Sequence, residues 1–168
     1  MKRRIIFILS LLLTAAVLAV LFGFSSQTAS QSNGVSKEVA RLLAEKLPWL
    51  MKRLTLRQLN HLLRKLAHFT LYFLLGCGLT GLLRAREKAL PVLIAVPIGA
   101  LCAALDELHQ SLVPGRGPGM RDVILDTCGV MAAVGLILLC IFFSRRRKRT
   151  KEEGCGDPTN GSRRKGTL

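Results

Sequence analysis

Four long runs of apolar residues constrain this chain more than any other feature of its sequence. Ile5–Phe24 contains twenty residues and no charge, which is about the length that crosses a hydrocarbon core of ~30 Å. The other runs are 66–83, 89–105 and 123–143. Because hydrocarbon offers no water to pair backbone N–H and C=O groups, each run is predicted to be a helix. The predicted fold class is therefore all-α, a four-helix transmembrane bundle.

The charge of the chain is segregated from its apolar runs. Of 168 residues, 25 are Lys or Arg and 10 are Asp or Glu, a net charge of +15, yet half of the chain is hydrophobic. Enough apolar surface is present to exclude a disordered chain. The few aromatic residues, and basic clusters that sit beside apolar runs, argue against a nucleic-acid binder. We expect the lipid bilayer as the main partner and no nucleic acid.

The flanking basic residues predict the orientation of the bundle. They precede the first run (2–4), separate the second from the third (84–88) and follow the fourth (145–149). Since cytoplasmic flanks are enriched in Lys and Arg, both termini are predicted to be cytoplasmic. The predicted outer segment 25–65 runs against this rule, because it carries eight Lys and Arg residues.

The sequence divides into four predicted parts. Residues 1–24 form an N-terminal transmembrane helix, which we interpret as an uncleaved anchor because twenty apolar residues exceed a usual signal-peptide core. Residues 25–65 form an extracytoplasmic loop with an amphipathic helix that Ser36 caps; this helix either lies on the lipid surface or packs on the bundle. Residues 66–143 are a three-helix core (66–83, 89–105, 123–143), with a kink at Pro97. Residues 144–168 are a basic cytoplasmic tail, expected to be disordered.

The remaining polar residues converge on one end of the predicted bundle. Each of the last three spans carries some of them near its outer end, and an outer turn contains Arg116. A carboxylate at the centre of a membrane typically costs ~2.5–3.5 kcal/mol, so such groups should face the interior and find partners. We expect Asp126 to point inward, opposite His68. The five cysteines, four of them inside apolar runs, form no disulfide or metal-binding framework, and we expect no resident metal or cofactor.

Three blocks of these residues, in order, resemble the VanZ-like family. They are Arg64-Lys-Leu-Ala-His-Phe-Thr-Leu-Tyr72, Asp106-Glu-Leu-His-Gln110, and Pro114-Gly-Arg116 followed by Arg121-Asp-Val-Ile-Leu-Asp-Thr-Cys-Gly129. Leu71 departs from the pattern, since many relatives have an acidic residue there. The resemblance implies a small bacterial multi-pass membrane protein of the cell envelope, and the founding member confers low-level resistance to teicoplanin. The positions that match the signature are Lys65, His68, Phe69, Tyr72, Asp106, Glu107, Gln110, Arg116, Asp122, Asp126 and Gly129.

Three hypotheses for the polar cluster follow. The first is a binding site for a lipid-linked envelope precursor or a glycopeptide-related ligand at the outer leaflet, formed by Lys65, His68, Tyr72, Asp106, Glu107, Gln110, Arg116, Asp122 and Asp126. The second is an outer-leaflet hydrolase or transferase. It would use His68 as general base or nucleophile tuned by Asp126 or Asp122, with Asp106 and Glu107 holding a proton or a divalent metal. The third is a purely structural cluster that joins the helices through ion pairs.

Overall fold

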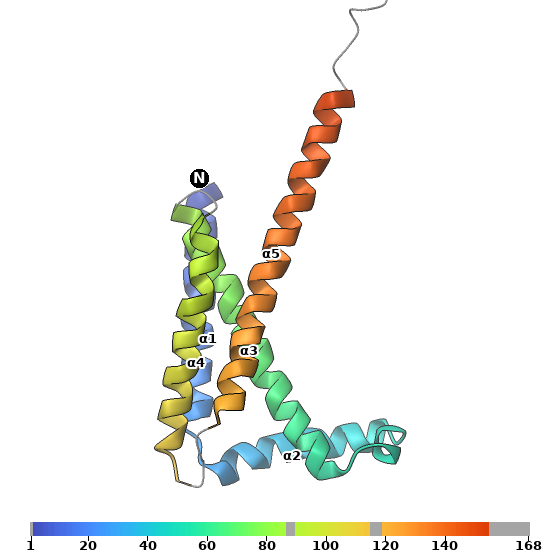
Figure 1. Ribbon diagram of the computed structural model, residues 1–168. Coiled ribbons are helices and arrows are strands. Elements are labelled where there is room, and N and C mark those ends of the chain that lie inside the picture. The colour runs from blue at the N-terminus through green and yellow to red at the C-terminus, as the bar shows by residue number, and fades with distance from the viewer. Residues whose placement is uncertain (1, 87–89, 115–118, 155–168) are drawn as a thin grey trace, which may run out of the picture. The chain divides into compact units, whose positions relative to one another are not determined.

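The computed structural model describes residues 2–86, 90–114 and 119–154. Contacts divide the chain into two compact units, Met1–Val134 and Gly135–Leu168. The described residues form helices without strands, in this order: α1 (Lys2–Ser25), α2 (Ala29–Lys46), η1 (Leu50–Lys52), α3 (Leu56–Arg86), η2 (Leu90–Ile94), α4 (Ala95–Ser111) and α5 (Met120–Gly154) (Figure 1). Within the described part of the chain, four segments are long and apolar enough to cross a membrane: Arg3–Ser25, Leu56–Ala85, Val92–Ser111 and Met120–Arg147. The predicted all-α class with four spanning helices is confirmed; the orientation of the termini stays a prediction.

In the first unit, α3 is the central helix and packs against α1, α2 and α4. Its core takes apolar side chains from every spanning helix: Val17, Leu21, Tyr72, Leu75, Val92, Ala95, Ala103, Val130 and Val134. α1 begins at the end of this unit where α3 ends. At the opposite end α1 and α4 end, α5 begins, and α2 leads sideways (Figure 1). That opposite end carries the polar cluster.

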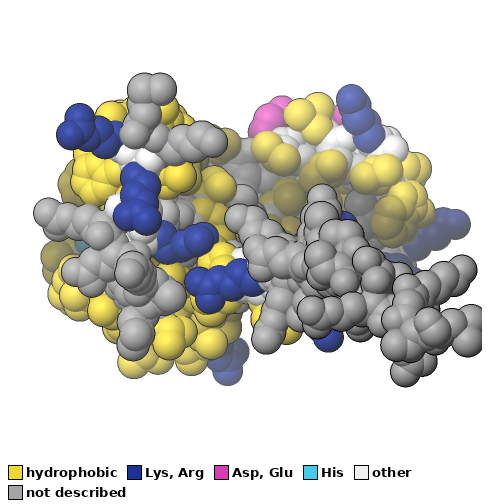
Figure 2. Space-filling model, turned by 90° about the horizontal axis from the view of Figure 1, so that it is seen from above, with side chains coloured by type: hydrophobic (Ala, Val, Ile, Leu, Met, Phe, Trp, Pro, Cys, Tyr) yellow, Lys and Arg dark blue, Asp and Glu magenta, His cyan; other side chains and the backbone are white. Residues whose placement is uncertain are grey.

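The outer surface of the spanning helices is apolar. On α1, the side chains of Ile5, Leu9 and Leu12 are at least half exposed, and hydrophobic side chains make up most of the coloured surface in Figure 2. In water such a surface would cost free energy, because apolar area contributes roughly 25 cal/mol per Å² when it is removed from water. Within a bilayer this surface would face lipid and carry no such cost.

Two helix starts differ from the sequence analysis. α2 begins at Ala29, not after Ser36, because Thr28 and Gln31 form a capping box that satisfies backbone N–H groups at the helix start. α3 begins at Leu56, ten residues before the predicted span, since the Thr55 hydroxyl accepts from the Gln58 N–H and the Gln58 amide oxygen accepts from the Thr55 N–H. Both polar motifs extend helices into sequence that apolar content alone assigned to a loop.

The position of Pro97 within its helix differs from the sequence analysis, which placed it in the interior. α4 begins at Ala95, so Pro97 lies in the first turn, where its missing N–H would have no partner within the helix anyway. The preceding Leu90–Ile94 is a 3-10 helix that contains Pro91. The third span is therefore shifted towards the C-terminus, and it carries Asp106 and Gln110 within its last two turns.

Small residues set the distances between the helices of the first unit. A Cβ atom on Gly129 of α5 would lie 2.7 Å from the Phe69 carbonyl oxygen and 3.2 Å from the Phe73 nitrogen of α3. A Cβ on Gly99 of α4 would lie 2.6 Å from the Val130 side chain. Glycine therefore permits close backbone approach here, as the small-residue spacing predicts.

In the second unit, α5 continues well past the predicted span. The helix runs on to Gly154, so residues 144–154 are helical and not part of a disordered tail. Residues 155–168, the rest of that predicted tail, lie outside the described part of the chain.

Candidate functional site

A polar cavity lies at the end of the first unit where α4 ends and α5 begins. Its volume is about 210 Å³, and three helices line it with the following residues: His61, Arg64, Lys65, His68, Gln110, Asp122, Leu125 and Asp126. Four of these residues lie on α3: His61, Arg64, Lys65 and His68. They recur at three- and four-residue steps and therefore share one face of the helix. Five of the predicted ligand-binding residues thus line a single cavity.

Asp106 lies in a network that joins α4 to the end of α1. The Ser25 hydroxyl donates to Asp106 Oδ1, and Gln110 Nε2 donates to Asp106 Oδ2 at 2.8 Å. Gln110 Nε2 also lies 3.3 Å from Ser25 Oγ. Both oxygens of the carboxylate therefore accept a hydrogen bond, and their directions are fixed by two buried side chains.

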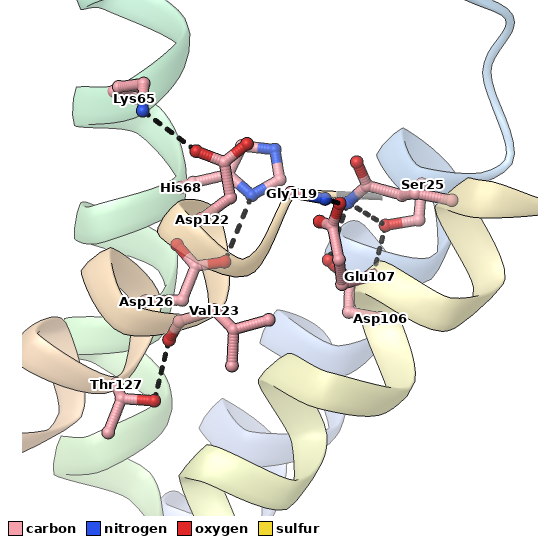
Figure 3. A network of polar contacts seen from close by, with 11 residues as sticks. Ser25, Lys65, His68, Asp106, Glu107, Gly119, Asp122, Val123, Asp126 and Thr127 are labelled. Atoms are coloured by element: carbon pink, nitrogen blue, oxygen red, sulfur yellow. Dashed lines mark hydrogen bonds and ion pairs between the residues drawn. The ribbon is translucent and has the colours of Figure 1, made fainter. Parts of the chain in front are cut away.

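His68 of α3 faces Asp126 of α5, as expected from their depth in the predicted spans. His68 Nδ1 and Asp126 Oδ2 are 3.6 Å apart, and Asp126 is only 3% exposed. That separation exceeds the ~2.7–3.2 Å of an N–H···O hydrogen bond. Among the described residues, His68 Nδ1 and Asp126 Oδ1 are buried without a hydrogen-bond partner. The dashed line between these two side chains in Figure 3 marks their ion pair.

The two other carboxylates have structural partners. Lys65 Nζ donates to Asp122 Oδ1 at 2.9 Å, in a pair whose side chains are 33% and 46% exposed. Glu107 Oε1 accepts from the backbone N–H of Gly119, the residue just before α5 (Figure 3). A carboxylate is favoured beside a helix N-terminus, so Glu107 holds the start of α5 against α4.

Tyr72 does not line the polar cavity. Tyr72 is fully buried and lines a separate cavity of about 420 Å³ together with Asp106 and His109. Its hydroxyl has no hydrogen-bond partner among the described residues. Arg116 lies outside the described residues.

An apolar groove adjoins the polar cavity. It has a volume of about 290 Å³ and runs between the end of α1, α2 and α3. Arg64 and His68 line both spaces. The apolar members of the groove are Phe24, Val35, Val39, Leu63, Ala67 and Leu71. Leu71, which departs from the family pattern, thus contributes apolar surface to the groove.

The sequence analysis did not include Ser25 among the site residues, although the Ser25 hydroxyl bonds Asp106. The sequence could have indicated Ser25, because it is the first polar residue after the first apolar run and therefore lies at the same end of the bundle as the acids. The groove had no comparable signal, since it depends on α2 folding back on α3. Chemically, the site combines two kinds of group. His61, Arg64 and Lys65 supply basic side chains, and the imidazole of His68 faces the carboxylate of Asp126.

Comparison with known protein families gives a match. A model of the family described as VanZ/LLP1 matches residues 7–143, a range that includes most of α1, all of α2, α3 and α4, the apolar part of α5 and every described site residue. No curated protein and no solved structure was found to be similar to the chain. The match covers most of the sequence, and the chain belongs to the VanZ/LLP1 family, as a membrane protein with four spanning helices.

Proposed function

We propose that this protein binds the anionic headgroup of a lipid-linked envelope precursor. The headgroup would lie in the polar cavity and the hydrocarbon chain in the apolar groove. One observation supports this most: Arg64 and His68 line both spaces, so a single molecule can place a charged end in one and an apolar tail in the other. Sites for amphiphiles need this combination of mostly apolar lining and a few placed polar groups.

The charges at the mouth of the cavity fit a phosphate. Arg64 Nη1 donates to Asn33 Oδ1 at 3.3 Å, and a guanidinium has five N–H donors, so others remain for a bidentate contact with phosphate oxygens. Lys65 adds a second charge that Asp122 partly balances. His61 lines the same mouth and adds a third basic group.

In this proposal the site end of the bundle faces the outside of the cell. The N-terminus of α1 and the C-terminus of α3 lie at the other end (Figure 1), and both are flanked by basic residues as in cytoplasmic ends. The eight basic residues of segment 25–65, which contradict that rule, have a function here because they attract an anionic lipid.

Met120 is 76% exposed beside the site. In a cysteine-free background, Met120→Cys is expected to react with a membrane-impermeant maleimide added to intact cells; reaction only after lysis would invert the orientation.

Lipid binding is tested with the full chain in nanodiscs. A fluorescent polyprenyl diphosphate is expected to bind, and the matching polyprenol, which has the same tail without phosphate, to bind much more weakly. Arg64→Gln removes a charge-assisted hydrogen bond of about 1.5–3 kcal/mol, which corresponds to roughly 10- to 100-fold weaker binding.

Arg57→Gln is the matched control. It makes the same charge change on the same helix, at an exposed residue that lines neither space. Binding should therefore fall for Arg64→Gln and stay near wild type for Arg57→Gln. An equal loss in both variants would indicate non-specific attraction to a basic surface, and equal binding of polyprenol and polyprenyl diphosphate would exclude a phosphate site.

A link to glycopeptide resistance is the physiological part of the proposal, and it comes from the family resemblance. A protein that holds a lipid-linked precursor at the outer leaflet limits what an antibiotic reaches. Expression in a susceptible bacterium should raise the inhibitory concentration of teicoplanin, and Arg64→Gln should abolish the increase at equal protein level. An increase that survives this substitution would separate resistance from the site.

The alternative function is an outer-leaflet hydrolase or transferase. The facing of His68 and Asp126 favours it, since a carboxylate that orients an imidazole is a common arrangement for a general base. Release of inorganic phosphate from polyprenyl diphosphate by the purified chain, lost in His68→Gln, would establish this alternative. Glu107→Gln should have little direct effect on such turnover, because Glu107 binds the start of α5.

A further inference from the structure

Three potential metal ligands from three helices converge in the floor of the polar cavity. His68 of α3, Asp106 of α4 and Asp126 of α5 each offer one ligand atom, and these atoms all lie within 4.8 Å of one another (Figure 3). Glu107, the other acid expected at this end, instead bonds the backbone of Gly119. The convergence is a product of the fold, because the three residues are far apart in the sequence.

Two polar atoms of this cluster, His68 Nδ1 and Asp126 Oδ1, are buried without a hydrogen-bond partner among the described residues. Asp126 is 3% exposed, and its Oδ2 lies 3.6 Å from His68 Nδ1, within the range of an ion pair but beyond that of a hydrogen bond. Buried polar groups are ordinarily paired, since each unmade hydrogen bond is costly. Two cationic side chains that line the cavity have other partners among the described residues: Lys65 pairs with Asp122, and Arg64 donates one hydrogen bond to Asn33.

The spacing suits a metal ion better than a hydrogen bond. With bonds of about 2.0–2.2 Å, two ligand atoms at adjacent corners of a tetrahedron are ~3.3–3.6 Å apart. His68 Nδ1 and Asp126 Oδ2 are separated by 3.6 Å. The other pairs of ligand atoms are at most 4.8 Å apart. Rotation of the side chains would have to bring these atoms closer by roughly 1 Å to reach the tetrahedral spacing.

The surroundings of Asp106 resemble the outer shell of a metal centre. Carboxylate ligands are usually held by hydrogen bonds from neighbouring side chains, and Asp106 accepts from Ser25 and Gln110. A divalent ion would also neutralise two carboxylates within a membrane-spanning bundle, where unpaired charge is expensive.

We propose that His68, Asp106 and Asp126 bind one divalent transition-metal ion of the Zn²⁺ or Mn²⁺ type. Imidazole suits Zn²⁺, and carboxylates suit Mn²⁺. Three protein ligands leave a further coordination position, which opens towards the polar cavity because His68 and Asp126 line it. The ion needs no lipid to bind, so this site goes beyond the proposed lipid binding and is tested without it.

The test uses the purified full chain in nanodiscs, stripped with a chelator and then titrated with Zn²⁺ or Mn²⁺ alone. One equivalent per chain is expected. Asp126→Asn and His68→Gln should abolish stoichiometric binding. Gln110→Leu, which removes a partner of Asp106, should weaken it by roughly 10- to 100-fold.

Asp122→Asn is the matched control, since it is the same change one turn earlier on α5, at a carboxylate that lines the same cavity outside the cluster. It should retain one equivalent of metal. Binding below one equivalent in the wild type, or equal retention in Asp122→Asn and Asp126→Asn, would overturn the proposal.

A measurement on the wild type removes any dependence on how the variants fold. Pulsed EPR of the Mn²⁺-loaded chain should show coupling to one imidazole nitrogen, which exposed carboxylates cannot produce. Loaded protein without nitrogen coupling would refute the His68 ligand. Failure of metal binding would leave the phosphate test with Arg64→Gln unaffected, so the two proposals fail separately.

Discussion

Gly129 offers the sharpest test of how the site is held together. It lies one turn after Asp126 on α5, and a Cβ atom there would stand 2.7 Å from the Phe69 carbonyl oxygen of α3. Carbon and carbonyl oxygen atoms ordinarily approach to about 3.3 Å at closest. Gly129→Ala therefore requires α5 to move by roughly 0.6 Å from α3, since the obstacle is backbone and cannot rotate away.

Two opposing contributions determine how much Gly129→Ala changes the free energy of unfolding. Overpacking of a close contact costs about 1–3 kcal/mol. Replacing glycine by alanine within a helix gains about 0.8–1.0 kcal/mol. The net loss for Gly129→Ala is thus about 0–2 kcal/mol.

Gly135→Ala separates the two contributions. Gly135 lies on the same helix, and a Cβ there would meet nothing within 4 Å. This variant keeps the gain in helix propensity without the clash, so it should be less destabilising than Gly129→Ala by the clash cost, about 1–3 kcal/mol.

The assay is reversible unfolding in mixed micelles, with the free energy of unfolding of each variant compared with wild type. Gly129→Ala should also weaken metal binding, because moving α5 away separates Asp126 from His68, now 3.6 Å apart. Equal free energies for the two alanine variants would refute the close approach of α3 and α5, and with it the geometry of the cluster.

Three further predictions concern single contacts. Thr28→Ala removes the cap of α2 and should cost about 1 kcal/mol, seen as faster hydrogen exchange in the first turn of α2; unchanged exchange would exclude the capping box. Tyr72→Phe removes a buried hydroxyl that has no hydrogen-bond partner among the described residues and should raise the free energy of unfolding by about 1–3 kcal/mol, whereas a loss of stability would reveal a bond to this hydroxyl. Lys65→Met breaks a partly exposed ion pair and should lower stability by no more than ~1 kcal/mol, with an effect that shrinks in high salt; a large, salt-independent loss would contradict this.

The sequence by itself determined the number of spanning helices and the end of the bundle at which the acids gather. Both follow from hydrocarbon, which sets the length of an apolar helix and confines charge to the ends of the spans. His68 and Asp126 could be placed opposite each other for the same reason, because depth in the membrane can be counted along the chain. Local polar motifs were also present in the sequence: the Thr28 and Thr55 caps that lengthen α2 and α3 could have been found from their spacing to Gln31 and Gln58.

Only the tertiary structure decided which partner each polar side chain meets. Depth does not fix the rotation of a helix about its axis, and that rotation brings Asp126 to His68, Asp122 to Lys65 and Glu107 to Gly119. The rotation is set by contacts between glycine on one helix and backbone or side chains on another, as at Gly129 and Phe69. Such contacts join residues distant in sequence, so no pattern along one helix specifies them. The groove beside the cavity has the same origin, because it exists only where α2 packs on α3.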